Sequence, residues 1–141
     1  MRIVAMLAAL GALLLCLLVL MQHRTGVEPA VDRFHDNYNG GQFDAIWDTA
    51  HPAKRSRFQS KDLQDVFKTK ESFKNYLKSA QDRFGKVVSS SRLSIGQMDK
   101  LSWTEKLVVV QRSAYEKGQG TEKFLFEIID HKPVLVGYEL R

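Results

Sequence analysis

The stretch "EKLVVVQRSAYEKGQGTEKFLFEIIDHKPVLVGYEL", residues 105–140, decides the fold. It contains three runs rich in β-branched and aromatic residues, separated by the polar segments "KGQG" (117–120) and "DHKP" (130–133). Short glycine- or proline-containing segments between such runs are typical of antiparallel hairpins. Together with the run that follows Gly85, these three runs predict a meander of four strands at 86–97, 105–116, 121–130 and 133–140.

Upstream of the strands, apolar residues recur at helical spacing. The first segment closes at Gly40, where we expect a left-handed residue, and a longer helix follows Thr69 and ends before Gly85. Gly40–Gly41 is interpreted as a joint between helices, because a phosphate-binding loop would need a preceding strand. Helices followed by a meander predict an α+β domain with the helices on one face of the sheet. The periodic sets are Val31, Phe34 and Tyr38; Phe43, Ile46, Trp47 and Ala50; Leu63, Val66 and Phe67 after Ser60; and Phe73, Leu77, Ala80 and Phe84.

The first residues, "MRIVAMLAALGALLLCLLVLMQHR" (1–24), differ from the rest of the chain. The uncharged run from Ile3 to Met21 reaches roughly 28 Å as a helix, which is close to the thickness of a bilayer core. We therefore predict a single-pass signal-anchor at 1–24, a short linker at 25–29 and one domain at 30–141. A cleaved signal peptide, lipidation and the reverse orientation are the alternatives to this anchor.

Composition narrows the classes of partner. The chain has 21 Lys and Arg against 16 Asp and Glu, and without the two arginines of the anchor the domain has 19 against 16. This excess of positive charge is smaller than nucleic-acid-binding domains usually carry, and no nucleic-acid partner is expected. The one cysteine, Cys16, lies in the apolar run, so the domain forms no disulfide of its own. No cofactor is expected.

Candidate catalytic residues do not converge in the sequence. The histidines, including His35 and His51, show no metal-ligand spacing, and the serine run 89–91 is interpreted as the polar edge of a strand. Strand alternation turns Phe124 inward and Glu127 outward, and in 105–116 the expected inward set contains Arg112 but no carboxylate. We therefore expect no carboxylate beside a tyrosine or histidine in the interior, and no enzyme.

Three segments carry a resemblance: "FHDNYNGGQFDAIWDTAHP" (34–52), "FKNYLKSAQDRFGK" (73–86) and "KPVLVGYEL" (132–140). With the order of elements, they make the chain similar to the nuclear transport factor 2-like superfamily, the cone-shaped, SnoaL-like and cystatin-like folds. More narrowly, it resembles small bacterial membrane-tethered domains of that fold. The resemblance implies helices packed on a curved four-stranded sheet, but the fold hosts enzymes, adaptors and assembly factors alike.

These observations predict a non-catalytic protein–protein interaction module in the bacterial envelope, anchored in the inner membrane with its domain on the periplasmic side. A pocket for a small apolar ligand is the alternative, and an isomerase- or dehydratase-like enzyme ranks third. The candidate pocket residues are Tyr38, Trp47, Phe73, Arg112 and Tyr138. The candidate interface, for a second copy or an envelope partner on the outer sheet face, consists of Leu107, Val109, Leu125, Ile129 and Leu135.

Overall fold

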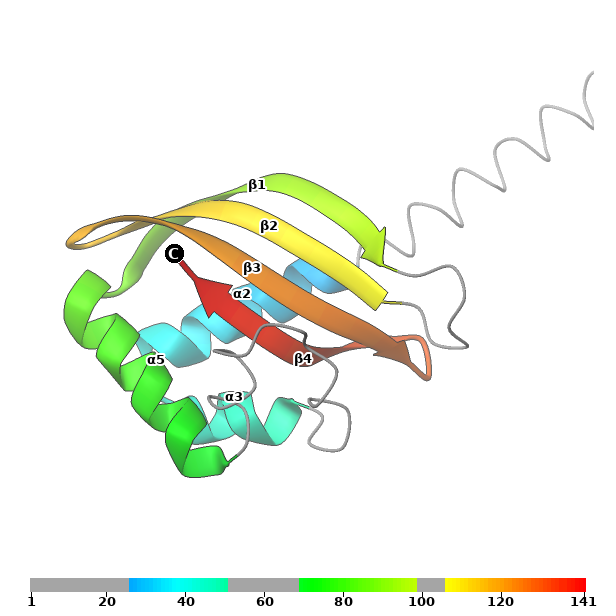
Figure 1. Ribbon diagram of the computed structural model, residues 1–141, viewed down its shortest axis with the longest axis horizontal. Helices are drawn as coiled ribbons and strands as arrows, with labels where there is room; N and C mark the ends of the chain where they lie inside the picture. Colours follow the sequence, from blue (N-terminus) through cyan, green and yellow to red (C-terminus); the bar gives the residue numbers. More distant parts are fainter. Residues whose placement is uncertain (1–25, 51–68, 99–105) are drawn as a thin grey trace, which may run out of the picture.

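The computed structural model describes residues 26–50, 69–98 and 106–141 and shows an α+β domain (Figure 1). Its helices all lie on one face of a curved antiparallel sheet, whose strands follow one another in chain order from β1 to β4. Strands β1 and β4 are therefore the sheet edges. The predicted α+β class and the meander are confirmed. The elements are α2 (Val27–Asn39), α3 (Phe43–Thr49), α5 (Lys70–Phe84), β1 (Val87–Met98), β2 (Lys106–Tyr115), β3 (Gly118–Ile129) and β4 (Lys132–Leu140).

The domain begins earlier than predicted. Helix α2 starts at Val27, inside the range expected to be a linker, and the Val27 side chain is only 1% exposed because it packs in the core. The predicted anchor at 1–24 and the predicted short helix after Ser60 lie outside the described residues. Within the part of the chain that the structure describes, no helix has the length and apolar character of a membrane span.

Capping and turn residues explain both ends of α5 and the joint between α2 and α3. Thr69 caps α5 through a reciprocal capping box with Ser72, and Gly85 ends it with φ 80°. The left-handed residue between α2 and α3 is Gly41 (φ 67°), not Gly40 as predicted, because the Gly40 amide still donates to the Asp36 carbonyl.

The two hairpins whose turns lie within the described residues are tight. Asp130 and His131 have φ of 49° and 62° between the paired residues Ile129 and Lys132, which is the geometry of a two-residue type I′ turn. The other turn is formed by residues 116–117 rather than by 117–120, because β3 already begins at Gly118.

The face of each strand that meets the helices differs in part from the prediction. On β2 the buried residues are the odd-numbered set from Leu107 to Tyr115, because Val109 lies opposite Phe124 and Leu107 opposite Phe126. On β4 a register shift lets Leu135 and Tyr138 both face inward, opposite Phe126 and Phe124. The predicted placement of Leu107, Val109 and Leu135 on the outer face is therefore wrong, since all three belong to the core.

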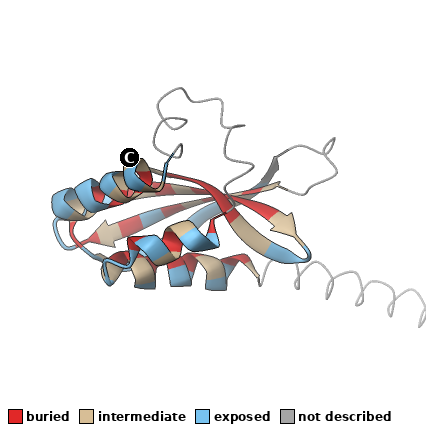
Figure 2. Ribbon diagram, turned by 90° about the horizontal axis from the view of Figure 1, so that it is seen from below, coloured by how far each residue is buried: buried red, intermediate tan, exposed pale blue. Residues whose placement is uncertain are grey.

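The core fills the space between the helices and the inner sheet face (Figure 2). Phe73 and Leu77 of α5 are fully buried. Phe34 of α2 meets the Phe124 ring edge-on at 5.0 Å between centroids and the Tyr138 ring at 4.5 Å. These contacts place α2 across the middle of the sheet, and the site described next lies beside it.

Candidate functional site

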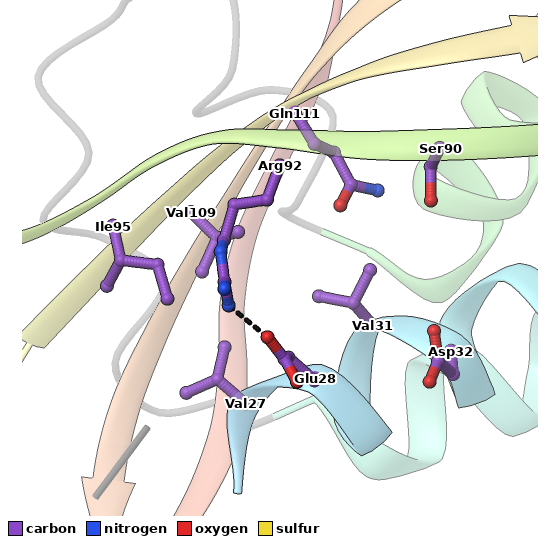
Figure 3. Close-up of a pocket in the computed structure, with 9 residues that line it drawn as sticks. All are labelled: Val27, Glu28, Val31, Asp32, Ser90, Arg92, Ile95, Val109 and Gln111. Carbon is purple, nitrogen blue, oxygen red and sulfur yellow. Dashed lines mark hydrogen bonds and ion pairs between the residues drawn. The ribbon is translucent and has the colours of Figure 1, made fainter. Parts of the chain in front are cut away.

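A cleft of about 240 Å³ opens between α2 and the inner face of the first two strands (Figure 3). Val27 and Val31 line it from α2, and Ile95 and Val109 line it from the sheet. Polar groups surround these aliphatic side chains. They are Glu28, Asp32, Ser90, Arg92 and Gln111.

Two side-chain contacts tie α2 to β1, and one of them is part of the cleft lining. Near the C-terminal end of the helix, the Asn39 side chain donates to the Val87 carbonyl at 2.9 Å and accepts from the Val87 amide at 2.7 Å. Near the N-terminal end, the Arg92 guanidinium pairs with the Glu28 carboxylate (Figure 3). The helix and the edge strand are thus held near both ends of the helix, and the Arg92–Glu28 pair belongs to the wall of the cleft.

A cluster of polar side chains is buried behind the cleft, around the fully buried carboxylate of Glu122. One of its oxygens, Oε1, accepts from the Tyr138 hydroxyl at 2.7 Å. The other, Oε2, accepts from His35 Nε2 at 2.9 Å, from Gln111 Nε2 at 3.1 Å and from the Ser113 hydroxyl. The expectation that the interior holds no carboxylate beside a tyrosine or histidine is therefore wrong.

The donors around Glu122 keep its carboxylate ionised. Burial alone would raise the pKa of Glu122, but the hydrogen bond and charge of His35, with the hydroxyls of Ser113 and Tyr138, outweigh burial and lower the pKa to about 2. An ionised carboxylate only accepts hydrogen bonds, so His35 Nε2 must carry a hydrogen. The 3.2 Å approach of Gln111 Nε2 to His35 Nε2 is then a contact between two donors to one oxygen.

Two further tyrosine hydroxyls lie in this interior. The hydroxyls of Tyr38 and Tyr115 are buried and have no hydrogen-bond partner among the described residues. Burial, and after it the charge of Glu122, raises the pKa of both phenols. Because the phenols stay neutral, they supply no base near Glu122.

The predicted pocket residues lie outside the lining of the α2–β1 cleft. Tyr38, Phe73 and Tyr138 belong to the packed core, and Trp47 is a partly buried neighbour whose ring lies 5.5 Å from that of Phe73. Arg112 is exposed, because it alternates with the buried Gln111 and Ser113 and so points away from the helices. None of the five lines the α2–β1 cleft.

The predicted interface residues are likewise redistributed. Val109 lines the cleft, and Leu107 and Leu135 are core residues. Leu125 and Ile129 alternate with Phe124 and Phe126 and so lie on the outer side of β3, where Leu125 is buried and Ile129 half-buried. An interface role for these two residues stays a prediction.

Sequence reasoning missed Glu122 although a signal for it was present. Glu122 lies two residues before Phe124 and therefore shares its inward face. Gln111 and Ser113 were missed because the alternation of β2 was assigned to the wrong face, since its run of consecutive aliphatic residues fits either assignment. His35, which has no metal-ligand spacing in the sequence, is buried and donates to the Glu122 carboxylate.

Neither a metal cluster nor a known relative identifies the site. Within the described ranges, no three His, Cys, Asp or Glu side chains are grouped so that they could hold a metal ion. Comparisons with protein-family models, with curated proteins and with solved structures find no match to the chain.

Proposed function

We propose that this chain is a membrane-anchored, non-catalytic protein–protein interaction module of the bacterial envelope, and that the α2–β1 cleft is its binding site. Residues 1–24 hold it in the inner membrane with the domain on the periplasmic side. The observation that carries the proposal is the position of the cleft, which opens beside an edge strand of the sheet.

An edge strand offers main-chain donors and acceptors that an incoming extended segment can pair with. Most of the β1 side chains are exposed, among them Val88 at 69% and Leu93 at 52%. Both lie where the β1–β2 register shifts, so parts of the strand bulge and a long uninterrupted ladder with a second copy is disfavoured. A short segment that makes a few main-chain bonds and inserts one side chain suits this edge better.

The size of the cleft supports the same occupant. Pockets that enclose a drug-sized ligand usually measure about 300–1,000 Å³. At about 240 Å³, and open to solvent, the cleft suits a single side chain or a very small molecule.

The buried polar cluster supports a structural role more than a catalytic one. A general base needs a pKa near the working pH and access to the substrate. Glu122 has a pKa of about 2, is fully buried, and its two oxygens are occupied by four donors. It therefore orients its neighbours and does not exchange protons with a ligand in the cleft.

Site-specific photo-cross-linking in living cells tests the proposal. A photoreactive phenylalanine analogue placed at Ser90, on the rim of the cleft, is expected to yield one defined adduct with an envelope protein. The matched control places the analogue at Arg112, which is also exposed but points to the other side of the sheet. The same adducts from both positions, or none from Ser90 when the protein is made normally, would contradict binding at the cleft.

A further inference from the structure

The side-chain amide of Gln111 lies at the floor of the cleft, and its oxygen accepts no hydrogen bond from the described residues. The residue is only 5% exposed, and its nitrogen donates to Glu122. Its oxygen has no partner within the described residues, is not sealed from solvent, and points into the cleft in Figure 3. An amide oxygen that solvent can reach is an acceptor at which a ligand donor can take the place of water.

The buried cluster fixes the direction of this amide. If the Gln111 side chain were rotated by half a turn, its oxygen would face the ionised carboxylate of Glu122, and two acceptors would meet without a proton between them. The nitrogen therefore stays on the Glu122 side. As a result, the floor of the cleft presents an acceptor, and a ligand must bring a donor to it.

The rim sets the charge of that donor. Glu28 and Asp32 contribute two carboxylates to the cleft, and Arg92 contributes one guanidinium that already pairs with Glu28. Among the described residues, Asp32 has no ion-pair partner. An anionic ligand would meet these carboxylates and the Gln111 oxygen, whereas a cation would find acceptors at both the rim and the floor.

The remaining walls set the shape of the ligand. Val31 and Val109 line the cleft beside Gln111, and Val27 and Ile95 line it beyond the Arg92–Glu28 pair. Aliphatic walls favour a methylene stem, and lysine combines such a stem with a compact ammonium that carries three donors.

We propose that the α2–β1 cleft binds a primary ammonium group on a short aliphatic stem, and that this group is a lysine side chain of the partner segment. The ammonium donates to the Gln111 oxygen and to Asp32, and the stem lies against Val31 and Val109. This inference rests on the proposed function, because it names the side chain that the interaction module recognises.

The test uses the full-length, ¹⁵N-labelled protein in a mild non-ionic detergent and follows the side-chain amide resonance of Gln111. The probes share a stem and differ in the head group: n-butylammonium, n-butanol and pentanoate. Two capped pentapeptides, identical except for a central lysine or methionine, distinguish a side chain from a free amine. We expect n-butylammonium and the lysine peptide to shift the Gln111 resonance, and the alcohol and the methionine peptide to bind at least about tenfold more weakly.

Variants on α2 give a matched comparison. Asp32→Asn should weaken binding of n-butylammonium by about threefold to tenfold, because it removes one carboxylate from the rim. Asp36→Asn removes a carboxylate that is also exposed, from the same helix but outside the cleft, and should leave binding unchanged. Gln111→Met removes the reporting resonance, so its binding is followed through the backbone amides of Val31 and Asp32. The variant should lose binding, and an otherwise retained amide spectrum would show that the fold is intact. The Asp32→Asn comparison stands even if the Gln111 variant does not fold.

The outcomes separate the two proposals. Equal binding of the alcohol and the ammonium, stronger binding of pentanoate, or equal effects of Asp32→Asn and Asp36→Asn would overturn the ammonium inference while leaving a binding cleft. Binding of n-butylammonium but of neither peptide would keep the ammonium chemistry and overturn the lysine partner. If no probe shifts Gln111, the ammonium inference fails, whereas the cross-linking from Ser90 decides the interaction module independently.

Discussion

The ionised carboxylate of Glu122 should make the stability of the domain depend on pH at the acid end. In the folded protein its pKa is about 2, against 4.5 for an ordinary glutamate. At about 1.4 kcal/mol for each tenfold change in proton affinity, this difference corresponds to about 3 kcal/mol of folding free energy. Because the folded pKa is the lower of the two, the contribution is complete at a pH well above 4.5 and is lost as the pH falls toward 2.

The measurement is urea unfolding of the full-length protein in detergent, followed by tryptophan fluorescence, at a series of pH values from about 6 to about 2. Other carboxylates also titrate in this range, so the wild type is compared with Glu122→Gln, which lacks the titrating group. At neutral pH the variant should be less stable by about 3–5 kcal/mol, because a buried amide replaces the charge that His35 and the hydroxyls are arranged around. This gap should narrow as the pH falls through the pKa of Glu122.

A constant gap between the two proteins across the whole pH range would refute the reasoning, since it would mean that Glu122 does not lose a proton in the folded state within that range. Ser94→Ala, on the exposed part of β1 away from the cluster, is the control for unspecific effects of substitution. It should leave both the stability and its pH dependence as in the wild type.

Three other outcomes follow from the sequence and the fold. The full-length chain should sediment with membranes and keep its N-terminus at Met1, and deletion of residues 1–24 should release it; a mature product without these residues would show a cleaved signal peptide instead. Phe73→Ala should cost about 3–5 kcal/mol in urea unfolding because the side chain is fully buried, and a cost below about 1 kcal/mol would contradict its core position. Asn39→Ala should cost about 1–3 kcal/mol by leaving the Val87 amide and carbonyl without their partner, and an unchanged unfolding midpoint would contradict the tie.

Periodicity predicted the elements well because it reports on burial along a single helix or strand. The apolar spacing around Phe34 and the capping residue Thr69 located α2 and α5, and the turn "DHKP" located the last hairpin. The inward face of a strand is harder to predict when both faces are aliphatic. In β2, Val108 and Val110 are as apolar as Leu107 and Val109, and only the pairing with β3 decides between the two sets.

The register shift in β4 also made the inward face of a strand hard to predict from the sequence. It adds a residue opposite Leu125 and so brings Leu135 and Tyr138, which strict alternation would separate, onto the same face. Strict alternation therefore placed Leu135 on the outer face. The position of a bulge depends on how two strands pair, and nothing in the sequence of β4 alone marks it.

The site depends on residues that are polar and buried, which is why a prediction based on apolar faces did not find it. Gln111 lies opposite Glu122 across β2 and β3, Ser113 follows on the same inward face, and His35 reaches the carboxylate from α2. Each residue alone is an ordinary polar position on a strand or helix. Together they fix an ionised carboxylate in the core, the carboxylate fixes the Gln111 amide, and the amide presents its oxygen to the cleft. In the proposed complex, the acceptor that meets the ligand is thus oriented by a charge that the ligand does not touch.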